Sequence, residues 1–289
     1  MNSIHIDALR TILATKNGTS VPGAPKCIGG THHRRPRVRG GLLTGAGLTN
    51  MHLGLPDLGF MDLSQVVDHT IAIRGVVDMP LIVDADTGFG NALNVAHTVR
   101  TLERAGASAV QLEDQVTPKR CGHFSGKELV RSEEMVNKVK AAVDARRENV
   151  VIIARTDARA VDGLEAALDR ASRYIEAGAD MTFVEAPEGL DEVSQIPTRL
   201  AVPQMLNMVV GGKTPIVGRE QAAEMGFSLI LYANAALQGA VQGMQTALRA
   251  LRERGSLDEA SGLVATFVER QRLVNKPKFD EMERRYAYT

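Results

Sequence analysis

Residues 81–114 read LIVDADTGFGNALNVAHTVRTLERAGASAVQLED, and this stretch decides the fold. Two apolar, β-branched runs, Leu81–Asp86 and Ala109–Asp114, flank residues 91–105, where apolar side chains recur with a helical period. Gly106 follows this helical stretch directly and can adopt the left-handed conformation that ends a helix. The pattern predicts a strand, a helix and a second strand parallel to the first.

The same unit recurs along the chain. Besides the two runs above, short apolar strands are predicted at Leu42–Thr44, Val150–Thr156, Met181–Ala186, Pro203–Met208 and Leu229–Asn234. Helices are predicted near 62–77, 91–105, 132–146, 163–177, 190–199, 218–225 and 235–253. With Thr19–Ala24 as a first strand, eight such units in about 250 residues predict a closed (β/α)8 barrel of the TIM type. An open, doubly wound parallel sheet is the alternative fold.

Domain organisation follows from what the sequence lacks. No interdomain linker or low-complexity tract interrupts the repeats, so we expect a single domain over residues 1–289. Residues 255–289 contain another amphipathic helix followed by Asn275-Lys276-Pro277. We expect this part to be a C-terminal helical extension that packs outside the barrel.

Composition excludes several classes of function. The chain has 34 Lys and Arg against 34 Asp and Glu, and this zero net charge argues against a nucleic-acid-binding protein. Its 44% hydrophobic residues argue against extensive disorder. The two cysteines, Cys27 and Cys121, cannot build a secreted disulfide framework, so we expect a cytoplasmic protein. No signal peptide or run of 18 apolar residues is present, so we expect no membrane partner.

Polar side chains collect where the predicted strands end. These residues are Thr44, Gly45, Asp84, Asp86, Glu113, Asp114, Arg155, Glu185, Asn207 and Asn234. Since the carboxyl ends of parallel strands open on one face of a barrel, we expect an active site there. The alternative, that each residue caps the following helix, explains single positions better than the whole set.

Asp84 and Asp86 predict a metal site. Their spacing of two puts both carboxylates on one face of a strand, where they repel each other unless a cation lies between them. Oxygen ligands suit Mg²⁺ or Mn²⁺, which keep several bound waters. Glu113 and Asp57 can hold those waters. Asp86 as a helix N-cap is the alternative for one member of the pair.

The segment Pro118-Lys119-Arg120-Cys121-Gly122-His123 combines two cations, a thiol and an imidazole. We expect Lys119, Arg120 and His123 to lower the pKa of the Cys121 thiol and to make it usable in proton transfer or nucleophilic attack. Gly122 and Gly126 allow the stretch to move as a lid. An inert buried cysteine and a Schiff base on Lys119 are the alternatives.

Two further features suit carboxylate recognition. Arg155 ends a predicted strand and can bind a carboxylate with two hydrogen bonds, unless it forms a structural pair with Asp157 or Glu185. The loop Asn207-Met208-Val209-Val210-Gly211-Gly212-Lys213-Thr214-Pro215 offers an amide, a hydroxyl and backbone N–H groups for a second carboxylate.

Four motifs in order carry a family resemblance: residues 84–91 (DADTGFGN), 112–115 (LEDQ), 118–123 (PKRCGH) and 154–158 (ARTDA). Together they resemble the isocitrate lyase/phosphoenolpyruvate mutase superfamily. The resemblance implies a (β/α)8 barrel, a C-terminal helix exchanged between subunits, and a homotetramer that is a dimer of dimers. It also implies Mg²⁺ bound together with an α-keto or α-hydroxy acid.

The resemblance also implies roles for individual residues. Asp86 resembles the direct metal ligand, with Asp84, Asp57 and Glu113 holding its waters. Thr44, Gly45 and Ala46 match the loop that binds the keto-acid carboxylate, and Arg155 matches the arginine over the oxyanion. Cys121 matches the acid/base of the lyases, accompanied by Lys119 and His123. The remaining substrate-binding positions implied are Arg120, Gly122, Glu185, Asn207 and Gly212.

The two loops narrow the implied chemistry. Cys121 favours carbon–carbon lyases over phosphoenolpyruvate mutases, and the loop 207–215 is similar to that of 2,3-dimethylmalate lyase and the petal death protein. The resemblance therefore implies retro-aldol or hydrolytic cleavage of a small di- or tricarboxylate such as 2,3-dimethylmalate or oxaloacetate. Carboxyphosphonoenolpyruvate mutase chemistry and methylisocitrate cleavage are alternatives. A degenerate barrel that binds diacids without turnover is the non-enzymatic alternative.

Residues 25–41, PKCIGGTHHRRPRVRGG, depart from the family pattern. They carry five Lys and Arg, no acid and no periodicity, although their length matches the relatives. Their codons can be chosen so that a neighbouring frame reads PSASAARIIEDPGFEAV, which resembles the family's helix. We therefore hypothesise a local reading-frame error. A basic insert for an anionic partner is the alternative.

Overall fold

The computed structural model describes residues 2–24 and 40–287 of the chain. Its strands are β1 (Thr19–Pro22), β2 (Gly41–Leu43), β3 (Leu81–Asp84), β4 (Ala109–Glu113), β5 (Val151–Thr156), β6 (Met181–Val184), β7 (Met205–Asn207) and β8 (Leu229–Tyr232). Each lies within a predicted run or overlaps it, and each strand pairing is parallel. The predicted α/β fold with parallel strands is confirmed.

The strands form two sheets that meet at both edges. One sheet has the order β2-β3-β4-β5-β6 and the other β1-β8-β7. Single parallel bridges join them, from Gly23 to Leu42 at one edge and from Thr182 to Gln204 at the other. Within the first sheet Glu113 lies opposite Arg155, so the polar ends of β4 and β5 are neighbours.

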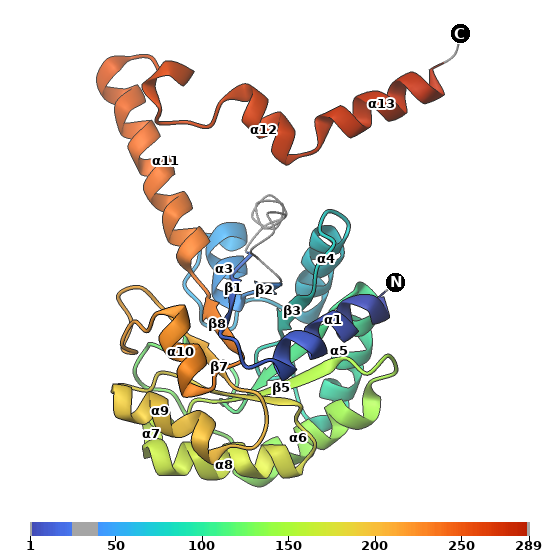
Figure 1. The fold of residues 1–289 in the computed structure, drawn as a ribbon, viewed down its shortest axis with the longest axis vertical. Coiled ribbons are helices and arrows are strands. Elements are labelled where there is room, and N and C mark those ends of the chain that lie inside the picture. Colours follow the sequence, from blue (N-terminus) through green and yellow to red (C-terminus); the bar gives the residue numbers. More distant parts are fainter. Residues whose placement is uncertain (1, 25–39, 288–289) are drawn as a thin grey trace.

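Helices alternate with the strands around the outside (Figure 1). They are α4 (Leu63–Arg74), α5 (Ala92–Ala105), α6 (Ser132–Ala145), α8 (Leu164–Glu176), α9 (Leu190–Arg199), α10 (Arg219–Met225) and α11 (Ala235–Arg254), with two short helices, α3 (Gly45–Leu48) and α7 (Arg159–Asp162). A π-helix spans Thr49–Leu53. The seven longer helices match the predicted ones. Asn91 caps α5 and Gly106 ends it with a φ of 101°, so Asp86 is not the N-cap of this helix.

Strands β2 to β7 are buried along their whole length, which explains their largely apolar sequences, whereas alternate residues of β1 and the last residue of β8 are only partly buried. Leu81 and Val83 of β3 pack outward against Val95 and Val99 of α5. Ile82 between them belongs to an inner core with residues of other strands and of α1 (Asn2–Ala14). The core therefore fixes the directions in which the strand ends present their polar residues.

The C-terminal part leaves this body. Helix α11 extends away from the strands, and α12 (Phe267–Leu273) and α13 (Lys276–Tyr286) continue beyond it (Figure 1). A short 3-10 helix, Glu259–Ser261, joins α11 to α12. Phe267, Val268 and Phe279 on this arm are exposed. Among the described residues, no helix is long and apolar enough to cross a membrane.

The basic segment 25–41 lies almost wholly outside the described residues. Only its last two residues, Gly40 and Gly41, are described, and Gly41 begins β2. The reading-frame hypothesis stays a prediction.

Candidate active site

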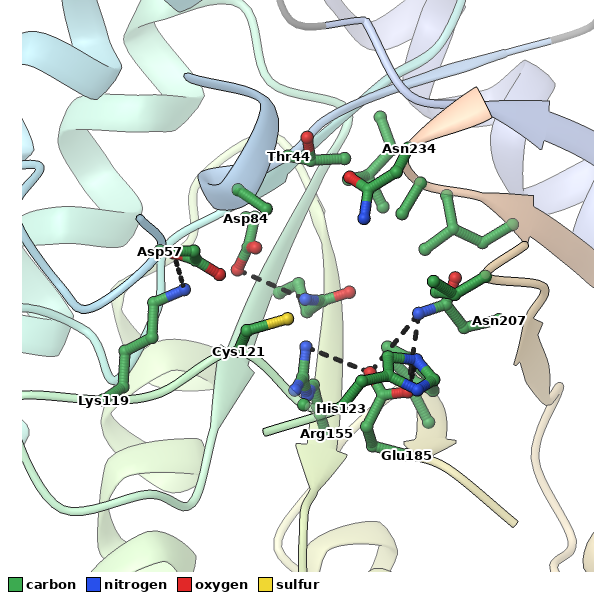
Figure 2. A pocket seen from close by; sticks show the side chains of 18 residues that line it. Thr44, Asp57, Asp84, Lys119, Cys121, His123, Arg155, Glu185, Asn207 and Asn234 are labelled. Atoms are coloured by element: carbon green, nitrogen blue, oxygen red, sulfur yellow. Dashed lines mark hydrogen bonds and ion pairs between the residues drawn. The ribbon is translucent and has the colours of Figure 1, made fainter. Parts of the chain in front are cut away.

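A pocket that is partly open to solvent lies at the carboxyl ends of the strands (Figure 2). The structure brings together there many of the residues that the sequence singled out: Thr44, Ala46, Asp57, Asp84, Lys119, Cys121, Gly122, His123, Arg155, Glu185 and Asn207. Gly45, Asp86, Glu113 and Gly212 lie next to these lining residues. Most of the polar strand ends therefore share one site, whereas Asp114 is fully buried and accepts hydrogen bonds from Thr156 and Tyr174 instead.

One side of the pocket is rich in carboxylates. Asp86 follows the end of β3 and has a φ of 47°, in the left-handed region that non-glycine residues rarely adopt. The Lys119 ammonium lies 2.6 Å from Asp57 Oδ1 and 3.1 Å from Asp86 Oδ1. Gly45 donates its N–H to Asp84 Oδ2 at 3.2 Å. A Cβ on Gly45 would lie 2.9 Å from Asp86 Oδ1, so glycine permits this close approach.

Burial and crowding change the acidity of these groups. Burial raises the pKa of Asp86 to about 6, and Asp84 and Asp57 add to the rise while Lys119 opposes it. Burial also raises the pKa of Glu113 well above its usual value, against the effect of Arg155. Burial alone would lower the pKa of Lys119, but Asp86 and Glu113 raise it well above its usual value. The charge of Lys119 alone therefore does not offset the burial of Asp86 and Glu113, and additional positive charge would be needed to keep both carboxyl groups ionised.

The donor set of this side fits a hard divalent cation held largely through water. Among the described residues, Glu113 Oε1 and Gln111 Oε1 are buried and find no hydrogen-bond donor. Among residues 2–24 and 40–287, no three His, Cys, Asp or Glu side chains converge closely enough to ligate a metal together. Mg²⁺ requires only one or two direct carboxylates and keeps several waters, so this arrangement is compatible with it.

Arg155, at the end of β5, organises the opposite side. Its Nε and Nη2 donate to Asp157 Oδ2 and Oδ1 at 2.9 and 3.0 Å. Its Nη1 lies 3.2 Å from Glu185 Oε2, and its Nε lies 3.4 Å from Glu113 Oε2. Both acids that the sequence offers as the alternative partners of Arg155, Asp157 and Glu185, are paired with it. The side chain is buried beside Phe183, 5.3 Å from the ring centre, and the three carboxylates raise the pKa of Arg155 against the effect of burial.

His123 and Asn207 complete this side. His123 Nε2 lies 3.4 Å from Glu185 Oε1, and its Nδ1 accepts the backbone N–H of Lys213 at 3.3 Å. Asn207 Nδ2 lies 3.4 Å from both oxygens of Glu185. The carbonyl oxygens of the Asn207 and Asn234 side chains are buried and accept no hydrogen bond from the part of the chain that the structure describes. The loop after β7 therefore contacts the loop that carries Cys121.

Cys121 lies between the two sides, and Figure 2 shows its sulfur directed into the space between them. The expected lowering of its pKa is wrong. Burial raises the pKa of Cys121, and Asp57 and Glu185 add to the rise, against the backbone N–H of His123 and the charge of Arg155. Lys119 is committed to Asp57 and Asp86. The thiol is therefore neutral at neutral pH.

Arg120 does not reach this pocket. Its side chain is exposed and lines a separate surface cleft with Gln115, Thr117 and Glu128. The backbone of Arg120 is fixed instead, since its N–H and C=O bond to the side chain of Gln115. The structure therefore gives no support to the expectation that Arg120 binds substrate.

Sequence reasoning missed two buried polar residues. Gln111 of β4 lines the pocket and donates to Asp84 Oδ1 at 3.2 Å. Gln111 lies two residues before Glu113 in an otherwise apolar strand, and this spacing indicates that both side chains point to the same face of the strand. Lys127 is buried and its ammonium lies 2.9 Å from Asp157 Oδ1. The loop that contains Lys127 has no periodic pattern from which the direction of this side chain could be predicted.

Comparison with known proteins finds close relatives. Residues 38–252 match the family model described as phosphoenolpyruvate phosphomutase. The chain is 40% identical over 280 residues to 2,3-dimethylmalate lyase of Eubacterium barkeri, covering 96% of this chain and 97% of the relative. It is 47% identical over 214 residues to 2-methylisocitrate lyase of Aeropyrum pernix, covering 74% of this chain and 69% of the relative.

Solved structures agree with these matches. A 2,3-dimethylmalate lyase has a TM-score of 0.91 at 32% identity, covering 97% of this chain and 95% of that one. Oxaloacetate acetylhydrolase in complex with 3,3-difluorooxalacetate has a TM-score of 0.91 at 30% identity, covering 97% and 96%. A phosphonopyruvate hydrolase solved with oxalate and Mg²⁺ has a TM-score of 0.87 at 30% identity, covering 98% and 99%.

Proposed function

Because the chain belongs to the isocitrate lyase/phosphoenolpyruvate mutase superfamily, we propose that its pocket cleaves a carbon–carbon bond of a small 2-hydroxy or 2-oxo dicarboxylate. One observation carries the proposal: the neutral Cys121 thiol lies between a carboxylate-rich side around Asp86 and a side organised by Arg155. A lyase needs both, because one half of the substrate gains oxygen charge while the other half accepts a proton.

The carboxylate-rich side is the proposed metal site. Asp86 would bind Mg²⁺ or Mn²⁺ directly, and Asp84, Asp57 and Glu113 would hold its waters. The raised pKa of Asp86 and the unpartnered Glu113 oxygen support this assignment. When bound, the cation supplies positive charge that polarises the oxygens of the 2-oxo acid half. Lys119 would turn its ammonium from Asp86 toward the substrate.

The 2-oxo acid half would bind between this site and Arg155. Thr44, Gly45 and Ala46 lie at the start of α3 beside Asp84, and their backbone N–H groups would bind a carboxylate once the Gly45 N–H leaves Asp84 Oδ2. Arg155 keeps a fixed orientation because Asp157 holds its guanidinium with two hydrogen bonds. Its charge would stabilise the C2 oxygen while that oxygen is deprotonated, before it becomes a carbonyl oxygen.

Cys121 would protonate the departing half. In a 2-hydroxy acid, the 2-hydroxyl would give its proton to a carboxylate of the carboxylate-rich side, and its oxygen would become the carbonyl oxygen of the 2-oxo acid as the carbon–carbon bond breaks. The electron pair of that bond would move to the departing fragment, which would take a proton from the thiol. A 2-oxo acid would first add water at its carbonyl carbon and then follow the same steps. A thiol with a raised pKa holds its proton at neutral pH, so the raised pKa of Cys121 suits a general acid. His123, Asn207, Gly122 and Gly212 would hold the second carboxylate of the substrate, and Glu185 would orient His123 and Asn207.

Incubation with Mg²⁺ and single substrates tests the proposal. The panel contains oxaloacetate, 2,3-dimethylmalate, citramalate, methylisocitrate and phosphonopyruvate, with release of a 2-oxo acid or oxalate as the readout. The 47% identity to a 2-methylisocitrate lyase gives methylisocitrate its place on the panel. Turnover of phosphonopyruvate alone would replace the proposal by phosphorus–carbon chemistry. If the intact, folded protein cleaves none of them, the remaining hypothesis is the non-enzymatic one, a barrel that binds diacids without turnover.

The finer architecture is also a proposal. The two bridges between the sheets support a closed (β/α)8 barrel, and the single domain 1–289 would include residues 255–289 as an extension. The exposed apolar residues on α12 and α13 support exchange of this arm within a homotetramer. Light scattering of the purified chain tests the tetramer. A cytoplasmic location stays a prediction from the cysteine content.

A further inference from the structure

Lys127 is a buried lysine in an exposed stretch of the loop 119–128, which carries Cys121 and His123. Its neighbours Gly126 and Glu128 are exposed, whereas Lys127 is only 7% exposed. A lysine is almost never buried unless its ammonium group is paired. The partners of this ammonium therefore indicate what the residue does.

Those partners link the loop to the strand that carries Arg155. Lys127 Nζ donates to Asp157 Oδ1 at 2.9 Å and also to the backbone carbonyl of Gly122. Asp157 is fully buried and accepts two hydrogen bonds from Arg155. One ammonium thus holds both the backbone next to Cys121 and the carboxylate that orients Arg155.

The loop has little freedom at its ends and tight packing in its middle. The Gln115 side chain bonds the backbone of Arg120 at one end, and Val116 donates its N–H to the carbonyl of Glu128 at the other. In the middle, a Cβ on Gly122 would lie 2.5 Å from Arg155 Nη2. Any shift of Gly122 would therefore change the position of Cys121 relative to Arg155.

We propose that Lys127 is a positioning residue, which ties the loop of Cys121 to Arg155 through Asp157 and so fixes the thiol relative to the guanidinium. Lys127 does not line the pocket, so it acts through these partners. The roles of Cys121 and Arg155 in this inference rest on the proposed function. The link that Lys127 makes between Gly122 and Asp157 does not depend on it.

A ligand-free measurement tests the tie. Lys127→Met and Lys127→Gln are compared with Lys138→Met, which removes an equally buried lysine whose ammonium donates to the Thr87 carbonyl and does not touch the loop. The readout is the rate at which iodoacetamide alkylates Cys121, followed by mass spectrometry of the Cys121 peptide to separate it from Cys27. Losing charge-assisted hydrogen bonds should open the loop, so the Lys127→Met rate should rise about tenfold or more.

Hydrogen–deuterium exchange locates the effect. Exchange should rise in residues 119–126 of both Lys127 variants and stay unchanged there in Lys138→Met. Lys127→Gln can still donate to the Gly122 carbonyl, so its effect should be smaller, and it carries the test if Lys127→Met does not fold. Unchanged alkylation in both folded Lys127 variants would overturn the proposal. So would a rise in exchange spread evenly over the chain, because that indicates a general loss of stability.

Turnover provides the second readout. Misplacing a reacting group by about 1 Å can cost about 100-fold in rate, so kcat of Lys127→Met should fall by about that factor, with a much smaller change in KM. Equal losses in Lys138→Met would overturn the positioning role. If the loop opens as expected but the unmodified chain cleaves no dicarboxylate, the tie stands and the proposed function fails.

Discussion

Arg155 and Asp157 are joined by two parallel hydrogen bonds, from Nε to Oδ2 at 2.9 Å and from Nη2 to Oδ1 at 3.0 Å. A bidentate pair of this kind fixes the plane of the guanidinium as well as its position. The Asp157 backbone N–H in turn donates to Asp114 Oδ1 at 2.9 Å. The orientation of Arg155 is therefore built into the end of β5 before any ligand binds.

Asp157→Asn should destabilise the protein strongly. It leaves Arg155 and Lys127, both buried, without their shared counter-charge, and breaking a buried pair in this way costs about 3–5 kcal/mol. Urea unfolding at pH 7 measures the loss. A matched change at an exposed pair, Glu165→Gln beside Arg199, should cost much less, because water screens that pair. Equal costs for the two variants would contradict the account.

The pairing of Asp157 with Arg155 and Lys127 makes the free energy of unfolding depend on pH. Burial would raise the pKa of Asp157, but Arg155 and Lys127 outweigh it and lower the pKa from 3.8 to about 2. Since the folded state binds this proton less readily than the unfolded state, the contribution to stability is present above pH 4 and is lost as pH falls toward 2. The difference in Tm between the unmodified chain and Asp157→Asn should shrink over that interval. A constant difference would show that the charge of Asp157 is not what stabilises the fold.

The proposed metal site should show proton competition. The pKa of Asp86 is about 6, so below this pH a proton occupies the carboxylate that the cation needs. Apparent Mg²⁺ affinity should fall about tenfold for each pH unit below 6 and level off above it. Calorimetric titrations between pH 5 and 8 measure this. Asp86→Asn should lose binding, and Glu176→Gln, at an exposed carboxylate, should not; a flat profile would argue against Asp86 as a ligand.

Much of the scaffold could be predicted from the sequence because buried strands and amphipathic helices leave periodic patterns. The runs Ala109–Asp114 and Val150–Thr156 differ by one residue each from β4 and β5. The polar ends of these runs do meet, since parallel neighbours bring Glu113 opposite Arg155. The parallel direction and the pairing of these strands thus follow from the strand and helix patterns that recur along the chain.

The parts that could not be predicted lie where periodicity stops. Asp84 and Asp86 were expected to share a strand face, but β3 ends at Asp84 and Asp86 enters a left-handed turn. The Cys121 pKa was inferred from neighbours in sequence, whereas burial and the carboxylates of Asp57 and Glu185 determine it. Side-chain direction in a loop depends on tertiary contacts, which also explains why Lys127 was missed.

Cys121→Ala should separate chemistry from binding. Loss of a general acid costs about 10²–10⁴-fold in kcat, while the carboxylate partners around Arg155 remain. Steady-state kinetics on the accepted substrate should therefore show a low kcat with little change in KM. Ser125→Ala, at the exposed tip of the same loop, should turn over normally. Normal turnover by Cys121→Ala would remove the role given to the thiol.

Gly122→Ala should disturb the loop by steric overlap. The new Cβ would lie 2.5 Å from Arg155 Nη2 and 2.6 Å from Glu185 Cγ, and overpacking of this kind costs about 1–3 kcal/mol. Activity should fall with stability, because Cys121 is the adjacent residue. Gly218→Ala meets no atom within 4 Å and should change the free energy of unfolding by less than about 1 kcal/mol. A fully active, stable Gly122→Ala would contradict the close packing of the loop on Arg155.

The stoichiometry of cleavage tests the central claim most directly. The purified chain is incubated with Mg²⁺ and each dicarboxylate of the panel, and both fragments are quantified by NMR, alongside Cys121→Ala. The account predicts that one dicarboxylate is converted into equal amounts of two fragments, with the rate strongly reduced in the variant. A folded, Mg²⁺-supplied protein that yields no paired fragments from any dicarboxylate, or only rearranges or hydrolyses the phosphonate, would contradict it.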